Sequence, residues 1–355
     1  MDSENLENLC MFFLSKLPAE TSHDLARYFM KMELFTPGRY SIPESKTKLF
    51  DVELDNPFGI AAGFDKYAEL QDVVKSYGFG FIESGSYTFF GSKGNKKPRL
   101  FRDAESGGLI NRMGLNGIPA HVAQERLSKA KDPNSFAVNI AKTHDEEIIG
   151  EMAIKDVVYS YKLLKNLGIY TAINISCPNT AEGKIFEDLG SFRELVEEIR
   201  AEKAERKSRP LVFKFSPDLE KETLEKLIEI SYDIADGYEV TNTLPINHHI
   251  YGKGGLSGPK LRSYSREMVS FLRGNTNKTI LGCGGISTEK EAYELEEMGA
   301  EVFLVFNGFV HRHKENSYAG SKFSHKINEG LINLRRIKWE SVILKIPSIL
   351  IWCLY

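Results

Sequence analysis

Cysteine is scarce in this sequence, with four residues among 355 and no CxxC pair. Zinc ribbons, thioredoxin-like motifs and four-cysteine iron–sulfur sites all need closely spaced cysteines, so the sequence excludes them. The four are Cys10, Cys177, Cys283 and Cys353. Widely separated thiols of this kind are typical of a protein from a reducing compartment.

An excess of charge of one sign is also missing, because 46 Lys and Arg stand against 49 Asp and Glu. A nucleic-acid-binding domain carries a basic face, so nucleic acid is not an expected partner. Long apolar runs are absent too, since none reaches the roughly 18 residues of a membrane-spanning helix. The acidic start MDSENLENL has neither the basic region of a secretion signal nor an Arg-rich transit pattern.

Several catalytic signatures do not occur. There is no G-x-G-x-x-G or Walker A string, which argues against a nicotinamide cofactor in a Rossmann site and against a P-loop nucleotide. There is also no Ser-His-Asp arrangement and no His, Asp and Glu grouping with metal-ligand spacing. We therefore expect no metal.

What the chain does contain is a repeated alternation of strand and helix patterns. Eight β-rich runs are apolar throughout, as in parallel strands that are buried on both faces, and this predicts a closed (β/α)8 TIM barrel. A doubly wound open sheet is the alternative. The runs are 58–63, 79–88, 136–142, 170–177, 211–217, 237–243, 280–286 and 301–308. One intervening helix is well marked, by a T-x-x-E capping box at Thr288 and Glu291 and by Gly299 after its end.

The patterns divide the chain into four parts. Residues 1–36 carry apolar residues at helical spacing on both sides of Pro18, which predicts an amphipathic helical hairpin suited to a membrane surface. Residues 37–46 are rich in Pro, Gly and Ser and are expected to be a linker. The barrel would occupy 47–342, and 343–355 form an apolar tail with no assigned role.

Polar residues and glycines gather at the ends of the predicted strands. In a barrel of this kind those ends meet on one face, where active sites lie. The glycine-rich segments 254–258, 282–285 and 306–308 predict turns that hold a phosphate-bearing cofactor, although tight barrel turns would explain them equally well. Several asparagines are suited to a flat heterocycle with amide edges, namely Asn111, Asn174, Asn179 and Asn242.

The two central cysteines are expected to differ. Cys177 ends the fourth predicted strand, where a thiol could act as a base or a nucleophile. Cys283 is expected to be a small core residue, as is Cys10. The pair His248 and His249 is expected in a loop.

Nine strings carry a family resemblance. They are NPFGIAAGFDK, GFGFIESGSYT, NKKPRLFR, GLINRMGLN, INISCPNT, KFSPDL, VTNT, GGLSG and GCGGI. Together, and in this order, they resemble the dihydroorotate dehydrogenases. The resemblance covers residues from about 20 to 342.

This resemblance implies an enzyme that uses flavin mononucleotide (FMN) to oxidise dihydroorotate to orotate in de novo pyrimidine biosynthesis. Cys177 falls on the catalytic-base position, where it would remove a proton from ring carbon 5. The substrate-binding positions would be Lys66, Asn111, Asn174, Asn179, Asn242 and Thr243. The flavin-binding positions would be Ala62, Gly63, Ser86, Asn139, Asn174, Lys214, Thr241, Gly258, Gly285, Phe306 and Asn307.

The family has membrane-associated members that reduce quinone and soluble members that use fumarate or NAD. The hairpin of residues 1–36 resembles the quinone-reducing class, and His23 and Arg102 fall on positions that line its quinone tunnel. The resemblance thus implies a peripheral membrane protein on the cytoplasmic face of the inner or plasma membrane. Cys177 resembles the soluble class instead, because the quinone class normally carries Ser there.

The sequence departs from the family pattern at a few positions, among them Ala141, Leu244, Phe306 and Asn307. A quinone-linked dihydroorotate dehydrogenase is the favoured function. A soluble-type dihydroorotate or other dihydropyrimidine oxidoreductase and a non-catalytic flavin-binding relative remain as alternatives.

Overall fold

The structure is a computed structural model, and it describes residues 10, 12–34, 36, 42–176, 185–205, 208–310 and 323–343. Among the predicted site residues, Cys177 and Asn179 lie outside these ranges, as does the tail from residue 344 onward.

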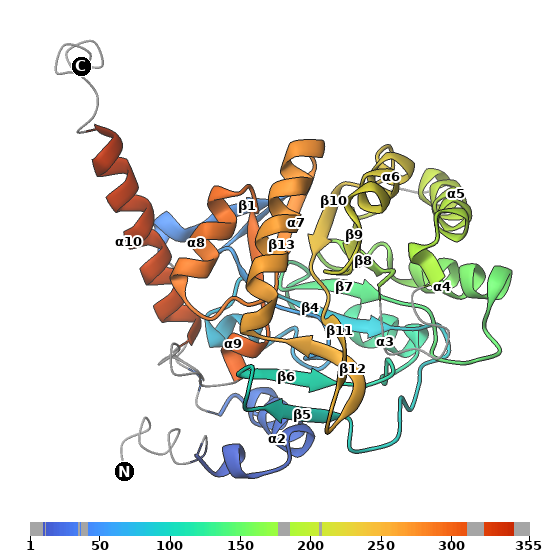
Figure 1. The fold of residues 1–355 in the computed structure, drawn as a ribbon, viewed down its shortest axis with the longest axis horizontal. Helices are drawn as coiled ribbons and strands as arrows, with labels where there is room; N and C mark the ends of the chain where they lie inside the picture. The colour runs from blue at the N-terminus through green and yellow to red at the C-terminus, as the bar shows by residue number, and fades with distance from the viewer. Residues whose placement is uncertain are drawn as a thin grey trace.

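Eight parallel strands close into a barrel, which confirms the predicted fold class (Figure 1). The order around the barrel is β10-β13-β14-β3-β4-β7-β8-β9, with every neighbouring pair parallel. The strands are β3 (Phe58–Ile60), β4 (Phe81–Tyr87), β7 (Phe136–Ile140), β8 (Thr171–Asn174), β9 (Leu211–Phe215), β10 (Gly237–Val240), β13 (Thr279–Cys283) and β14 (Val302–Val305). Seven of them fall inside the predicted apolar runs and β13 begins one residue before its run, at Thr279. The runs mark the strands because strands covered on both faces are mostly apolar on both faces.

Helices surround the barrel and connect its strands (Figure 1). They are α3 (Ala120–Leu127), α4 (Gly150–Leu164), α5 (Leu189–Glu205), α6 (Lys221–Ser231), α7 (Arg262–Asn275), α8 (Glu289–Glu297), α9 (Asn307–Val310) and α10 (Phe323–Ile343), with short 3-10 helices η1 (Pro43–Ser45), η2 (Val74–Tyr77), η3 (Ile185–Glu187) and η4 (Pro259–Leu261). Helix α8 begins with the predicted capping box, in which the backbone N–H of Thr288 donates to Glu291 Oε2 over 2.6 Å. It ends at Glu297 with Met298 as its C-cap, and Gly299 follows with a φ of 109°, which glycine tolerates well.

The core has two parts because alternate side chains of each barrel strand point in opposite directions. On β4, Ile82 packs outward against the helices, whereas Phe81 packs inside the barrel. The inner cluster is continued by Leu49 and Leu54 of a small hairpin, β1 (Thr47–Leu49) with β2 (Val52–Leu54). The outer, larger cluster packs the barrel strands against the surrounding helices.

A four-stranded antiparallel sheet lies across one end of the barrel and was not predicted (Figure 1). Its order is β11-β12-β6-β5, from β5 (Leu100–Asp103), β6 (Gly108–Asn111), β11 (Leu244–His248) and β12 (Gly252–Ser257). Two expectations need correction here. His248 is the last residue of a strand rather than part of a loop, and Gly254 and Gly255 lie in β12 rather than in a phosphate-binding turn. A Cβ on Gly255 would come within 2.1 Å of Thr243 Oγ1, so this glycine allows close packing of the sheet.

The N-terminal extension lies against β5, an edge strand of this sheet. Residues 12–16 are helical and α2 (Ala19–Lys31) follows Pro18, so the predicted pair of helices is present in the described part. Buried Glu20 accepts a hydrogen bond from Arg99 Nε over 2.9 Å. Arg102 of β5 donates to the carbonyl oxygens of Leu14 and Leu17 over 3.2 and 2.6 Å. These contacts attach the extension to β5.

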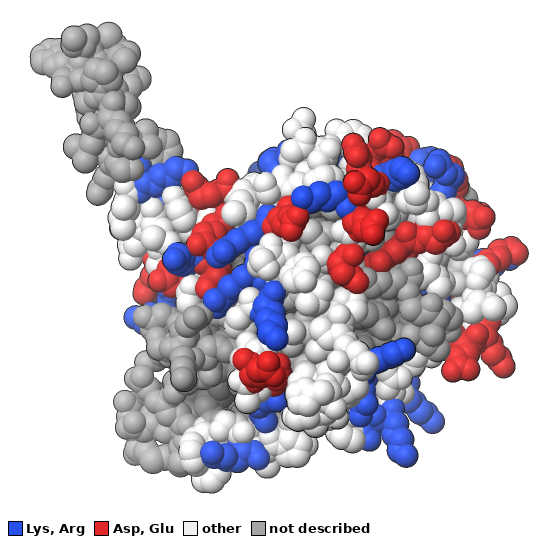
Figure 2. All heavy atoms as spheres, in the orientation of Figure 1, with Lys and Arg blue, Asp and Glu red and all other residues white. Residues whose placement is uncertain are grey.

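The exposed side of the extension is apolar. Large side chains with high exposure are Phe12, Phe13, Tyr28 and Met32. No helix in the described ranges combines the length and the apolar character needed to cross a membrane. The face drawn in Figure 2 carries both signs of charge, and basic and acidic side chains alternate over α7 and α8. Arg273 of α7 forms one ion pair, with Glu301 over 3.0 Å.

Candidate active site

One large pocket opens at the carboxyl ends of the barrel strands, between the barrel and the four-stranded sheet. It also reaches His23 of the N-terminal extension. The predicted site residues that line it are His23, Ala62, Gly63, Lys66, Ser86, Asn111, Asn174, Lys214, Thr241, Asn242, Thr243, Gly258, Phe306 and Asn307. Asn139, Gly285 and Arg102 do not line it. Residues far apart in the sequence therefore converge on one cavity.

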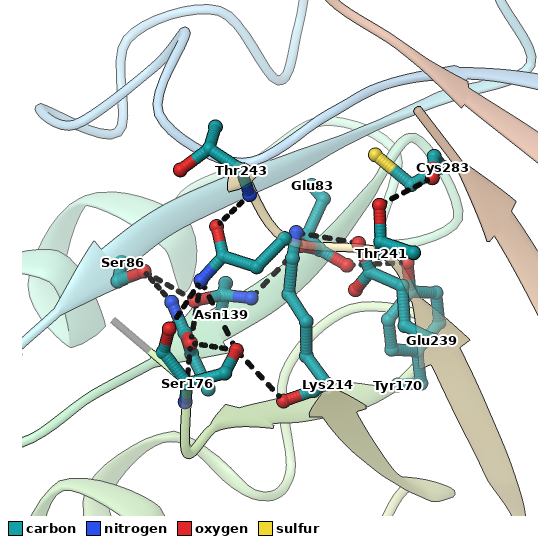
Figure 3. Close-up of polar contacts among 12 residues, drawn as sticks. Glu83, Ser86, Asn139, Tyr170, Ser176, Lys214, Glu239, Thr241, Thr243 and Cys283 are labelled. Carbon is teal, nitrogen blue, oxygen red and sulfur yellow. Dashed lines mark hydrogen bonds and ion pairs between the residues drawn. The ribbon is translucent and has the colours of Figure 1, made fainter. Parts of the chain in front are cut away.

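The floor of the pocket is a network of amides and hydroxyls at the ends of β8 and β10 (Figure 3). Asn174 Oδ1 accepts hydrogen bonds from Asn242 Nδ2 over 3.2 Å and from the Ser176 backbone N–H over 3.1 Å. Asn242 Oδ1 accepts one from the Thr243 N–H over 2.8 Å. Because their neighbours fix these amides, they are already oriented for a planar polar ligand.

Below this floor, inside the barrel, lies a cluster of ionisable side chains (Figure 3). Lys214 Nζ lies 2.5 Å from Glu239 Oε1 and 3.5 Å from Glu83 Oε1, and both carboxyl groups are fully buried. Glu83 also accepts hydrogen bonds from the Tyr170 hydroxyl over 2.7 Å and from Asn139 Nδ2 over 2.8 Å. Asn139 thus supports the pocket from beneath, where it also accepts a hydrogen bond from the Ser86 hydroxyl.

The electrostatics of this cluster follow from burial and from the opposed charges. Burial disfavours the charge of Lys214, but the carboxyl groups of Glu239 and Glu83 outweigh burial and raise the lysine pKa above its usual range. Burial, followed by the nearby Glu83, raises the pKa of Glu239 well above its ordinary value. Lys214, which lines the pocket, therefore stays cationic and offers positive charge to a bound anion.

A second lysine approaches the pocket from the loop after β3. Lys66 Nζ donates to Asn116 Oδ1 over 3.2 Å. Burial and then the charge of Arg99 lower its pKa to about 8, against the opposing effect of Glu20. Buried Asp65 holds the loop in shape by accepting the backbone N–H of Leu70 over 2.9 Å. Lys66 is thus a cation whose charge is easily lost above neutral pH.

The side of the pocket toward the extension is apolar and aromatic. His23 stacks on Phe306, with ring centroids 5.9 Å apart and planes 12° from parallel. Burial, with Lys66 and Arg27 nearby, lowers the pKa of His23 to about 3, so the imidazole is neutral at physiological pH. The remaining apolar lining on this side is formed by Leu100, Leu109, Met113 and Leu115. The pocket therefore suits a polar ligand at its floor and an apolar ligand at its mouth.

Sequence reasoning missed several members of this site. Cys283 packs against the inner core cluster as expected, but it also lines the pocket, which was not expected. Burial raises the pKa of its thiol to about 12, in spite of nearby Lys214, so it stays protonated. Glu83 and Glu239 were also missed, although a glutamate inside each of the apolar runs FIESG and GYEV was a usable signal.

The structure also brings Asp103, Glu105 and His248 together, with ligand atoms within 4.8 Å of one another, which sequence spacing did not predict. His248 Nδ1 accepts hydrogen bonds from the backbone N–H groups of Ile250 and Tyr251 over 3.2 and 3.3 Å. The neutral ring therefore carries its hydrogen on Nε2, which faces Asp103 Oδ1 at 3.8 Å. A metal bound to Nε2 would move that hydrogen to Nδ1, where it would face the two backbone N–H donors, so the group forms a polar contact between two hairpins.

The family model described as dihydroorotate dehydrogenase matches residues 44–334, which include all eight barrel strands. The chain belongs to the dihydroorotate dehydrogenase family. Flavin dependence is general in this family. Two curated relatives named dihydroorotate dehydrogenase (quinone) come from Haloarcula marismortui and Christiangramia forsetii, each 34% identical. The matches cover 91% and 90% of this chain and 93% and 96% of the relatives.

A solved structure supports the same relationship. DHODH of Eimeria tenella in complex with ferulenol superposes with a TM-score of 0.80 at 26% sequence identity. The similarity covers 90% of this chain and 92% of that one.

The pocket fits a flavin on its own geometry. Lys214 supplies a buried cation that can balance the charge of a reduced flavin. Gly258 has a φ of 102°, and a Cβ there would come within 2.8 Å of Gly108 Cα, so glycine lets this wall of the pocket pack closely against β6. Flat aromatic and amide surfaces complete the lining.

Proposed function

We propose that this protein oxidises dihydroorotate to orotate with FMN as its cofactor and passes the electrons to a quinone. The observation that carries this proposal is the pocket, which joins a floor of amides and lysines to an apolar mouth under the N-terminal extension. Its curated relatives bear the name of that activity. The reaction would belong to pyrimidine biosynthesis.

The proposed roles follow from the chemistry of each side chain. Bound FMN would accept hydride and pass electrons on. Lys66 would hold the substrate carboxylate, and the amides of Asn174 and Asn242 would orient the pyrimidine ring. Cys177, outside the described residues, would remove the proton from ring carbon 5. Remaining substrate contacts would come from Asn111, Asn179 and Thr243, and FMN contacts from Ala62, Gly63, Ser86, Asn139, Asn174, Lys214, Thr241, Gly258, Gly285, Phe306 and Asn307.

The extension would dock the protein on a membrane surface from the cytoplasmic side. Its exposed Phe12, Phe13 and Met32 can enter the lipid interface, while Arg102 holds the segment on the barrel. His23 and the apolar pocket mouth would then receive the quinone from the membrane. Arg102 would act by positioning this segment.

Purified protein is expected to be yellow and to release FMN when denatured. Anaerobic dihydroorotate should bleach the flavin absorbance, and added quinone should restore it faster than fumarate or NAD. Dihydrouracil, which lacks the carboxylate, is the matched control and should bleach the flavin at least about a hundredfold more slowly because a lysine would be left unpaired. Flavin absorbance that persists after dihydroorotate is added would indicate a flavin-binding protein without this activity. Faster reoxidation by fumarate than by quinone would indicate a soluble-type dihydroorotate dehydrogenase.

Substrate affinity should depend on the charge of Lys66. Because the pKa of this lysine is lowered to about 8, the cation that would hold a carboxylate is present below that pH and is lost as the pH rises through it. The dissociation constant for orotate should therefore increase above pH 8. Lys66→Arg should move this increase to higher pH, since the guanidinium stays charged. An affinity that is flat with pH in the wild type would exclude this role.

A further inference from the structure

Among the described residues, the barrel interior below the pocket holds two carboxyl groups but only one lysine. Lys214 lies between Glu239 and Glu83, at 2.5 and 3.5 Å, and neither carboxyl is exposed. If both carboxyl groups were ionised, this buried cluster would carry a net negative charge. Unbalanced charge in a buried site is costly, and two neighbouring carboxyl groups commonly avoid that cost by sharing a proton.

The surroundings of the two carboxyl groups are unequal. Glu83 accepts hydrogen bonds from Tyr170 on one carboxyl oxygen and from Asn139 on the other, so both of its oxygens meet donors. Glu239 and Glu83 flank the same ammonium group of Lys214, and among the described residues neither oxygen of Glu239 has a hydrogen-bond donor apart from the ion-pair contact with Lys214. Glu239 is therefore the better place for the proton.

The strands that pack around Glu239 account for its titratable neighbours. Strand β9 contributes Lys214, which is paired with Glu239 in register, and β13 contributes Cys283. Across the barrel, β4 contributes Glu83, and Tyr170 precedes β8. Of these groups only Lys214 carries positive charge, and it can balance only one carboxylate.

We propose that Glu239 is a positioning residue that works as a neutral acid: it shares a proton with Glu83 and holds the Lys214 ammonium in place at the flavin pocket with its carbonyl oxygen. The expected effect on flavin binding rests on the proposed FMN function, whereas the proton on Glu239 does not. The raised pKa of Glu239 agrees with it, because burial and Glu83 both favour the protonated form.

Infrared spectroscopy of the full chain tests the proton directly. Wild type should show a carboxylic-acid C=O band that shifts in D2O and persists from neutral to mildly alkaline pH. Glu239→Gln should lose the band, and Glu53→Gln, which changes an exposed carboxyl, should keep it. Absence of the band in wild type, or its survival in Glu239→Gln, would overturn the proposal. This measurement can be made even if the protein proves to bind no flavin.

Flavin affinity tests the positioning role. Glu239→Gln keeps a neutral carbonyl oxygen and should bind FMN within about threefold of wild type, whereas Glu239→Leu should bind at least about tenfold more weakly because the hydrogen-bond partner of a buried ammonium is removed. Rescue by Gln is the decisive comparison, and the infrared result on the Gln variant stands if the Leu variant fails to fold. Equal weakening in both variants would show that Glu239 acts as an anion.

Discussion

Deleting residues 1–36 should abolish quinone reduction while leaving flavin reduction by dihydroorotate largely intact. The extension forms one side of the apolar pocket mouth through His23, which stacks on Phe306. The amides and lysines that would hold substrate belong to the barrel and its sheet, and they do not depend on α2 for their hydrogen bonds. Stopped-flow measurement of the two half-reactions separates these effects.

A point variant provides the same test without removing a helix. Arg102→Met removes the donors to Leu14 and Leu17 and should slow quinone reduction by about tenfold or more, with little change in flavin reduction, because bonds from a charged donor hold the segment. Arg200→Met is the matched control, since Arg200 donates two hydrogen bonds to Asp233, but on the helical surface outside the pocket. Full-rate quinone reduction by the deleted chain would refute the proposed docking role.

Replacing Cys177 with Ala should slow flavin reduction by at least about a hundredfold, the lower end of what a positioned base contributes. FMN and orotate affinity should be retained. A thiol can act near neutral pH after a modest lowering of its pKa, whereas a Ser hydroxyl needs help from a stronger acceptor. Cys177→Ser should therefore keep part of the rate and move its pH dependence upward. The rate constant of anaerobic flavin bleaching is the quantity to compare.

Alkylation distinguishes the two thiols near the site. Iodoacetamide should inactivate the wild type, and orotate should protect it. Cys283→Ala should remain sensitive, because the thiol of Cys283 has its pKa raised to about 12 and reacts poorly. Cys177→Ala should take up no label at the site. A Cys177→Ala protein that reduces its flavin at nearly the wild-type rate would remove this residue from the mechanism.

The barrel could be predicted because its signal is local. Each buried parallel strand is an apolar run, and the capping box at Thr288 marks a helix start without reference to the rest of the chain. The four-stranded sheet could not be predicted in this way. Gly254 and Gly255 of β12 have no side chains to show alternation, and β12 pairs with β6, which lies far away in the sequence.

The candidate site was predictable where a polar residue stands at or just after the end of a predicted strand. Lys66, Asn174 and Asn242 are such residues, and all three line the pocket. Glu239 was missed because a charged residue in a strand is usually assigned to a solvent-facing position, and only the closed barrel shows that this position faces inward. The lowered pKa of His23 has no local sequence signal, because it comes from burial against Phe64 and Phe306, which lie far away in the sequence.

The sheet over the barrel also bears on the order of events during synthesis. Asn111 on β6 donates to the carbonyl oxygen of Gly255 on β12, a partner 144 residues later in the chain. A nascent chain that has completed β3, β4 and β7 still lacks this partner, so the wall of the pocket that carries Asn111 cannot assemble until β12 has left the ribosome. Contacts this distant in sequence form slowly. We therefore expect ligand binding to arise late in folding, after the first barrel strands are made, and a chain truncated before residue 244 to be unable to bind orotate.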